Sequence, residues 1–209
     1  MLFLAVALIT CCPYQDAPMH EDAVELLATA RAHLDDANYA SAASAAFRAA
    51  DTVSERFFHR REGTLTDDVP RWKDAAVLAT ARAIMVAAVV RSGGAVDVHG
   101  KEIWSKPAAV EASEEARALL GEAAEEAPKN ALVQQVRAEL QVRAASSRPQ
   151  GVATLSFLGA RGKLTAPEAM AALATALSAE GAEEAAMRYA TLCEQLARWP
   201  KQCAPFEAD

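Results

Sequence analysis

The stretch Ala75–Val90, which reads AAVLATARAIMVAAVV, decides the fold class of this chain. Arg82 is its only charged side chain, so a helix through this stretch is apolar on nearly all sides and must be buried among other helices. The stretch is too short, and is interrupted by Arg82, to cross a bilayer, because a spanning helix needs about 20 apolar residues. It therefore predicts the central helix of a bundle, over about residues 71–91.

The sequence on either side predicts further helices. Apolar residues make up 52% of the chain and aromatic residues only 6%, and alanine, the best helix former, supplies much of the apolar part. Apolar spacings of three and four residues, broken by Gly, Pro and polar runs, predict seven more helices. They run over about 20–34, 39–59, 107–127, 130–145, 150–159, 167–180 and 182–199.

Two segments leave alternatives open. Residues 150–159 fit a short helix or a strand, and we expect a helix because the sequence offers no strand partner. The glycines of 92–106 and the alternation of Val96 and Val98 permit a small hairpin. Because most connections are short, neighbouring helices are expected to be antiparallel. The fold class is all-α, with about eight helices in antiparallel pairs.

The N-terminal residues 1–12, MLFLAVALITCC, differ from the rest in having no charged side chain. They match the apolar region of a secretory signal, although no basic residue precedes them. Leu8-Ile9-Thr10-Cys11 resembles the lipobox of bacterial lipoproteins, with Thr10 where that family has Gly, Ala or Ser. We expect a bacterial protein that is exported, either periplasmic or anchored to the outer membrane by a lipid on Cys11. The alternative is a first helix that begins at Met1 in a cytoplasmic protein.

The predicted domain organisation follows from this leader. Residues 1–12 are the leader, 13–18 a short linker, 19–200 a single helical domain and 201–209 a C-terminal tail. An oxidising compartment would permit a disulfide between Cys193 and Cys203, and two reduced thiols in the cytoplasm are the alternative.

Charge and motifs exclude several functional classes. The net charge of −7 argues against nucleic acid and against a polybasic membrane surface, because both need a dominant positive field. The sequence has no GxSxG motif, and His20-Glu21 lacks the second His of a zinc-protease helix. Gly159–Lys163 lacks the Ser or Thr and the first Gly of a phosphate loop. We therefore expect a non-enzymatic protein without a cofactor.

Three helix segments resemble the second helix of the tetratricopeptide repeat. The matching residues are Ala116, Leu120, Ala123 and Pro128; Tyr39, Ala42, Ala46 and Ala49; and Gly181, Ala185 and Tyr189. Successive pairs here lie further apart than that family's period of about 34 residues, and insertions at 61–69 and 92–106 would account for the excess. The resemblance implies a solenoid that binds a protein or peptide. The alternative is an irregular right-handed helical bundle.

The resemblance also implies contact residues. In this family the first helices of the pairs line the concave face, which makes Arg31, Arg82 and Arg137 candidates for partner contact. Arg82 has a second interpretation, because a guanidinium on an apolar helix must be paired or must reach solvent along the bundle edge.

Other candidates come from the residues themselves. Arg56, Arg60 and Arg61 flank Phe57-Phe58, and Arg and Phe are residue types that carry interface energy. Alternatively both Phe residues lie in the core and the cations complement a helix C-terminus. His99, with Asp97, lies in the long loop, where ligand contacts concentrate.

Two other functions remain open. The first is a small-molecule- or metal-binding bundle, with or without enzymatic activity, which would use the Asp97/His99 loop or Glu55 and His59 one helical turn apart. The second is a structural envelope lipoprotein, which depends on Cys11 alone.

Overall fold

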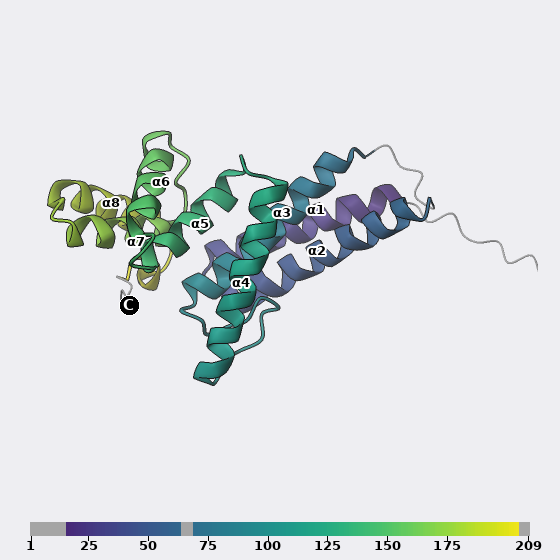
Figure 1. The fold of residues 1–209 in the computed structure, drawn as a ribbon, viewed down its shortest axis with the longest axis horizontal. Coiled ribbons are helices and arrows are strands. Elements are labelled where there is room, and N and C mark those ends of the chain that lie inside the picture. The colour runs from purple at the N-terminus through teal and green to yellow at the C-terminus, as the bar shows by residue number, and fades with distance from the viewer. Residues whose placement is uncertain (1–15, 64–68, 205–209) are drawn as a thin grey trace, which may run out of the picture.

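The computed structural model describes residues 16–63 and 69–204. This part of the chain is all-helical (Figure 1), with eight α-helices, a final 3₁₀ turn and no β-strand. The helices are α1 Asp16–Asp35, α2 Tyr39–Arg61, α3 Arg71–Arg91, α4 Lys106–Glu126, α5 Ala131–Arg143, α6 Arg148–Ala160, α7 Pro167–Ala179 and α8 Glu183–Leu196, followed by the turn η1 Pro200–Cys203. The all-α prediction is confirmed, including the helix over 150–159.

Polar side chains begin several helices where the sequence breaks its apolar pattern. The side-chain oxygen of Asn38 accepts from the backbone N–H of Ser41 at the start of α2. Asn130 accepts from the N–H groups of Leu132 and Val133 at the start of α5. Each such bond satisfies a backbone donor that the first turn of a helix leaves without a partner.

The ends of the chain differ from the expectation. α1 begins at Asp16, so the last residues of the segment expected as a linker are helical. Pro18 is tolerated there because the first turn of a helix has no intrahelical N–H bonds to lose. α8 ends at Leu196, where Ala197 turns extended (φ −66°, ψ 131°). Trp199 is extended as well (φ −134°, ψ 135°), because a residue before a proline is pushed out of the helical region. Residues 201–203, expected as tail, belong to the turn η1.

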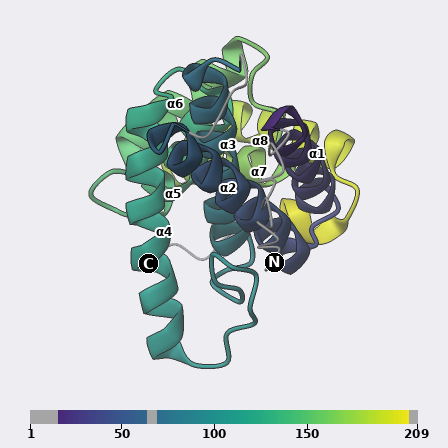
Figure 2. The ribbon, with the colours of Figure 1, turned by 90° about the vertical axis from the view of Figure 1, so that its right-hand side faces the viewer.

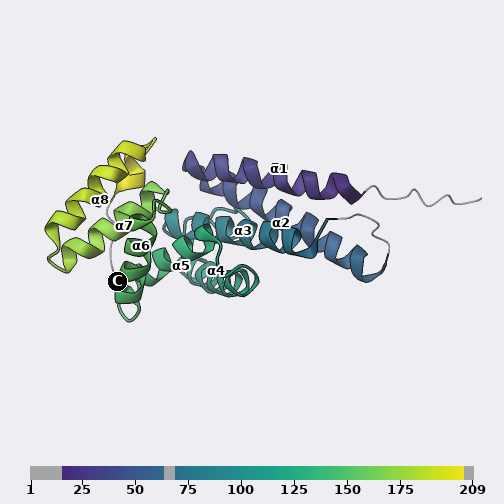
Figure 3. The ribbon, with the colours of Figure 1, turned by 90° about the horizontal axis from the view of Figure 1, so that it is seen from above.

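The helices pack as consecutive hairpins. Each odd-numbered helix contacts the even-numbered helix that follows it and also the next odd-numbered helix, from α1 and α3 through to α5 and α7. Viewed from above, the hairpins follow one another along the molecule (Figure 3). This arrangement is consistent with a helical bundle or a solenoid. It does not by itself establish a tetratricopeptide repeat.

Two apolar cores meet at α5. The larger core is built by α1–α5 around Ile84, Val86 and Val136, and the smaller by α5–α8 around Leu155, Leu158 and Leu173. α3 is buried along most of its length, as its apolar sequence predicts. α4 packs its Ala112, Ala116, Leu120 face on α3, and its first turns extend beyond the rest of the molecule (Figures 1 and 2).

The connection between α3 and α4 is mostly turns. Its only β-pairing among the described residues is an isolated antiparallel bridge between Val96 and Glu102. The small hairpin that the sequence permits is therefore reduced to this one bridge. Val98 enters the larger core, and Gly100 (φ +84°) lies so close to the Ala40 carbonyl of α2 that no side chain would fit. The loop is therefore packed onto the body.

Candidate functional site

A buried charge network lies where the two cores meet. Arg91, the last residue of α3, donates from Nε to Glu139 Oε2 at 3.0 Å and from Nη2 to Glu139 Oε1 at 2.7 Å. Its Nη1 lies 3.6 Å from Oε2 of Glu168 on α7, and the three side chains are 8% exposed or less. The two-pronged pairing offsets the large cost of removing these charges from water.

Neutral polar groups complete the network. Glu168 Oε1 accepts from the Tyr39 hydroxyl at 3.3 Å and from Gln202 Nε2 at 3.1 Å, and Gln135 Nε2 donates to Glu139 Oε1 at 3.2 Å. Burial, and then the charge of Glu168, raise the pKa of Tyr39 above its ordinary value. Burial opposes the charge of Arg91, but Glu139 and Glu168 together raise its pKa. The network therefore holds Tyr39 protonated and Arg91 charged.

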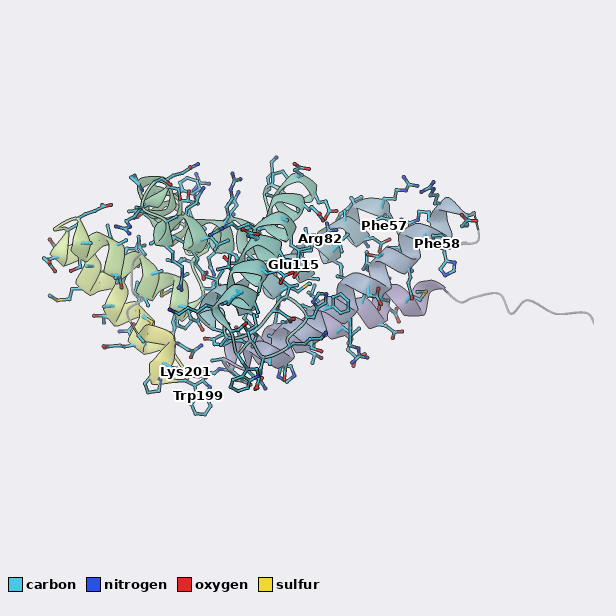
Figure 4. The ribbon with its side chains drawn as sticks, turned by 60° about the horizontal axis from the view of Figure 1, so that its bottom comes forward. Phe57, Phe58, Arg82, Glu115, Trp199 and Lys201 are labelled. Atoms are coloured by element: carbon cyan, nitrogen blue, oxygen red, sulfur yellow. A yellow bond between two sulfur atoms is a disulfide. The ribbon has the colours of Figure 1, made fainter. Side chains whose placement is uncertain are left out.

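Gln202 joins the end of the chain to its first hairpin. Its Nε2 also donates to the Asp35 carbonyl at 3.2 Å, and its Oε1 accepts from the N–H groups of Arg198 and Trp199 at 2.9 and 3.0 Å. Lys201 Nζ donates to the Ala37 carbonyl at 3.3 Å. Trp199 and Lys201 lie at the edge of the molecule on this C-terminal turn (Figure 4). We call these contacts the terminal clip.

The first of two clefts beside the network, the α1 cleft, has a volume of about 620 Å³. It is lined by α1, α3 and α5, by the segment that leads into α7, by the end of α8 and by the C-terminal turn. Its apolar side chains include Leu34, Leu132 and Leu196, and Arg91, Gln135 and Gln202 place polar atoms against it. Its remaining charged residues are Arg31, Asp35, Lys163 and Arg198.

The second, the α4 cleft, is larger, at about 1030 Å³. It lies between α4, the C-terminal ends of α3 and α5, α7 and the C-terminal turn, and Arg91, Glu168 and Gln202 belong to its lining as well. Its other charged residues are Lys106, Arg117, Arg143 and Lys201, all of them cations. Burial lowers the pKa of Arg143, and the nearby charge of Glu139 opposes that shift.

A separate buried ion cluster explains part of the Arg-Phe segment. Asp74 on α3 is fully buried and lies 3.3 Å from Arg56 Nε, 3.2 Å from Arg60 Nη1 and 2.8 Å from His20 Nδ1. Arg56 is itself fully buried, so it does not serve as the surface contact that the sequence suggested. The cluster ties α1, α2 and α3 together, and leaves Arg61 exposed.

The exposed phenylalanine of that segment is Phe58. It is 60% exposed, whereas Phe57 packs partly against a small apolar cluster around Val53 and Leu78. Both lie near the C-terminal end of α2, far from the C-terminal turn (Figure 4). The segment thus divides between core and surface.

The three arginines that the family resemblance singled out have different surroundings. Arg31 is exposed and lines the α1 cleft. Arg82 is paired with Glu122 Oε2 at 2.8 Å and Glu126 Oε1 at 2.7 Å, so it holds α4 to α3. Arg137 is exposed on α5 and lines neither cleft.

The structure does not assemble the candidate ligand residues, Asp97 and His99 in the loop or Glu55 and His59 on α2, into a metal site. Asp97 Oδ1 accepts from the backbone N–H groups of His99 and Lys101, and the His99 ring packs edge-on against Phe47 with centroids 4.6 Å apart. These are contacts that hold a loop in place. Glu55 and His59 gain no third ligand: within 16–63 and 69–204, no group of three His, Cys, Asp or Glu is arranged to hold a metal ion.

The cysteines near the C-terminus are bonded as a disulfide, Cys193–Cys203, which closes η1 onto α8. Cys11 and the rest of the leader lie outside the described residues. Among the helices that the structure describes, none combines the length and apolarity needed to cross a membrane.

Sequence reasoning missed Arg91, Glu139, Glu168 and Gln202. Glu139 carried a signal, because it lies between Ala138 and Val142 on the apolar face of its helix. A carboxylate in such a position must find a buried partner. The other residues of the network carried no such signal in the sequence, because they are distributed over α2, α3, α7 and η1.

A search of protein-family models, of characterised proteins and of solved structures finds no match to this chain.

Proposed function

We propose that this chain is a non-enzymatic, helical-repeat binding module that takes a peptide or a protein segment in the α1 cleft. The supporting observation is the composition of that cleft. Apolar side chains from α1, α5 and α8 line it beside buried polar groups, which include Arg91 of α3, and beside exposed charged side chains. Apolar and polar groups line the cleft in about equal shares. Binding sites combine apolar surface with placed polar groups that fix the orientation of the ligand.

The charged groups next to the cleft serve the structure. The oxygens of Glu139 and Glu168 accept hydrogen bonds or pair with Arg91, and Tyr39 is held protonated. A general base needs a proton acceptor that can reach a substrate. These carboxylates are committed to holding α3, α5 and α7 together, which supports a binding role over a catalytic one.

We propose further that the protein is exported. The Cys193–Cys203 disulfide supports this, because such bonds persist in oxidising compartments and are rare in the cytoplasm. Mass analysis of the mature N-terminus in a native host tests it. Signal cleavage or an acylated Cys11 is the expected result, and an intact Met1 would contradict export.

The binding proposal is tested by selecting peptides from a displayed library on the immobilised protein. Peptides with a recurring pattern should be enriched, and their binding should fall about tenfold in the variant Arg31→Glu/Lys163→Glu, which reverses two exposed cations of the cleft. The matched control is Arg137→Glu/Arg188→Glu, which changes net charge equally at exposed residues outside both clefts. No enrichment, or equal losses in the two variants, would refute the proposal.

A further inference from the structure

One face of α4 carries a stripe of cations and an exposed apolar side chain. Lys106, Val110, Ser113 and Arg117 follow one another at steps of four, three and four residues, which places them on one side of a helix. All four line the α4 cleft. Lys106 and Arg117 are exposed, and Val110 is 59% exposed. This stripe is distinct from the apolar face of α4 that packs on α3.

The opposite wall adds positive charge. Arg143 at the end of α5 and Lys201 on the C-terminal turn line the same cleft. Glu168 is the one carboxylate among the described residues that line it, and its oxygens are engaged by Arg91, Tyr39 and Gln202. The cleft is therefore strongly positive in a chain whose net charge is −7. Such a local reversal of sign attracts an anionic ligand.

The length of the stripe indicates the shape of that ligand. Lys106 and Arg117 are separated by eleven positions in the sequence. At a rise of 1.5 Å per residue, this corresponds to about 16 Å along the helix. A phosphate ion or a small dicarboxylate contacts one end only. An extended peptide of about five residues, at roughly 3.3 Å each, reaches both ends.

We propose that the α4 cleft binds an extended acidic segment of another protein, with carboxylates against Lys106 and Arg117 and an apolar side chain against Val110. This site goes beyond the proposed function, because it lies in a different cleft and uses different residues from the α1 cleft. The two proposals stand or fall separately.

The test uses the full chain and a labelled probe peptide, acetyl-Glu-Glu-Leu-Glu-Glu-amide, in fluorescence anisotropy. The wild-type protein should bind it, and the variant Lys106→Glu/Arg117→Glu should bind about tenfold more weakly, since two exposed charge contacts become repulsive. Raising the salt concentration about tenfold should weaken wild-type binding, because exposed charges are screened. Val110→Asp should weaken it as well.

Two matched variants serve as controls. Arg137→Glu/Arg188→Glu alters net charge by the same amount, and Arg31→Glu/Lys163→Glu alters the other cleft; both should bind the probe within about twofold of the wild type. Circular dichroism and thermal melts establish that each variant is folded. Because the substituted side chains are exposed, we expect unchanged melting.

Four outcomes would overturn the proposal. The first is an equal loss in the control variants, which would mean that the probe senses only net charge. The second is equal binding of a Lys-Lys-Leu-Lys-Lys probe. The third is a short single-stranded DNA bound more tightly than the acidic peptide. The fourth is a protein ending at Ala204 that binds the probe about tenfold more tightly, which would make residues 205–209 the occupant of the cleft.

Discussion

Arg91 keeps its charge inside the protein because both of its partners are fixed by separate helices. Glu139 receives two of its N–H groups and Glu168 lies 3.6 Å from a third nitrogen. Tyr39 and Gln202 donate hydrogen bonds to the other carboxylate oxygen of Glu168, Oε1. Removing either partner of such a buried pair leaves an uncompensated charge, which destabilises the fold strongly. We infer that the pair fixes how the hairpins meet.

The hydroxyl of Tyr39 gives a prediction about pH. At neutral pH, Tyr39→Phe should lower the free energy of unfolding by about 1 kcal/mol, the usual value of one hydrogen bond. The folded protein raises the pKa of Tyr39, whereas the unfolded chain ionises near pH 10. The stabilisation is therefore complete below pH 10 and is lost as the pH rises above it, because the unfolded state then releases a proton that the folded state retains.

Urea unfolding of both proteins at about pH 8 and about pH 11 measures this difference. The gap between wild type and Tyr39→Phe should shrink at the higher pH. A gap that stayed constant would mean that the folded state does not protect the hydroxyl proton.

At this scale the sequence could predict that a charge is buried, but not what it meets. The sequence predicts that the Arg82 guanidinium, on an apolar helix, is either paired or reaches solvent, and Glu122 and Glu126 pair with it. Which turn of another helix would face it could not be read from spacing along the chain. Glu139 raises the same difficulty, because Arg91 lies on another helix, 48 residues away.

Among the helices, α5 is the one that contributes buried residues to both apolar cores. α6 approaches it closely at Gly151, where an added Cβ would lie 2.6 Å from the Val142 nitrogen and 2.8 Å from the Ala138 oxygen. Backbone atoms cannot yield as a flexible side chain can. The small residue therefore sets the distance between the two helices.

Gly151→Ala should destabilise the protein by about 1–3 kcal/mol through overpacking, although alanine is the better helix former. Gly121→Ala on α4 is the matched control, because nothing lies within 4 Å of its added Cβ. That substitution should stabilise the protein by about 0.5–1 kcal/mol. Thermal unfolding measures both, and a Gly151→Ala variant that is stabilised as Gly121→Ala is would show that α5 and α6 can move apart.

Helices were the predictable part of this fold. Apolar periodicity, Asn38 and Asn130 as N-caps, and Pro or Gly at the breaks are local signals, and local signals determine where a helix begins and ends. The α4 cleft could not be predicted in this way. Lys106 and Arg117 could be assigned to one helical face, but Lys201 reaches the same cleft only because the C-terminal turn folds back.

For the molecule as a whole, the terminal clip is the unusual feature. A stack of helical hairpins needs contacts only between neighbours. Here Gln202 and Lys201 contact Asp35 and Ala37, so the turn after α8 is held by the loop between α1 and α2. The Cys193–Cys203 disulfide fastens that turn to α8. The first and last hairpins are thereby joined.

Gln202→Ala should lower stability by about 1–3 kcal/mol, because buried donors and acceptors lose their partner. Hydrogen exchange should speed up in residues 35–39 and 197–203 together, since the buried Gln202 side chain bonds to both segments. Gln195→Ala, at an exposed position on α8, is the control and should change neither. Faster exchange at only one of the two segments would mean that the clip does not couple them.

Because the first and last hairpins hold each other, we expect the segment most open to proteolysis to lie in the middle of the sequence. An open stack frays at its terminal hairpins, but here each of those is held by the other. The first turns of α4 extend past the body, and Trp104 just before them is 88% exposed. A protease that meets the native protein would therefore nick the chain near residues 104–110, in the middle of the sequence. The fragments would stay associated through the packing of α3 on α4 and α5 and through the terminal clip, because the Cys193–Cys203 disulfide lies wholly within the C-terminal fragment.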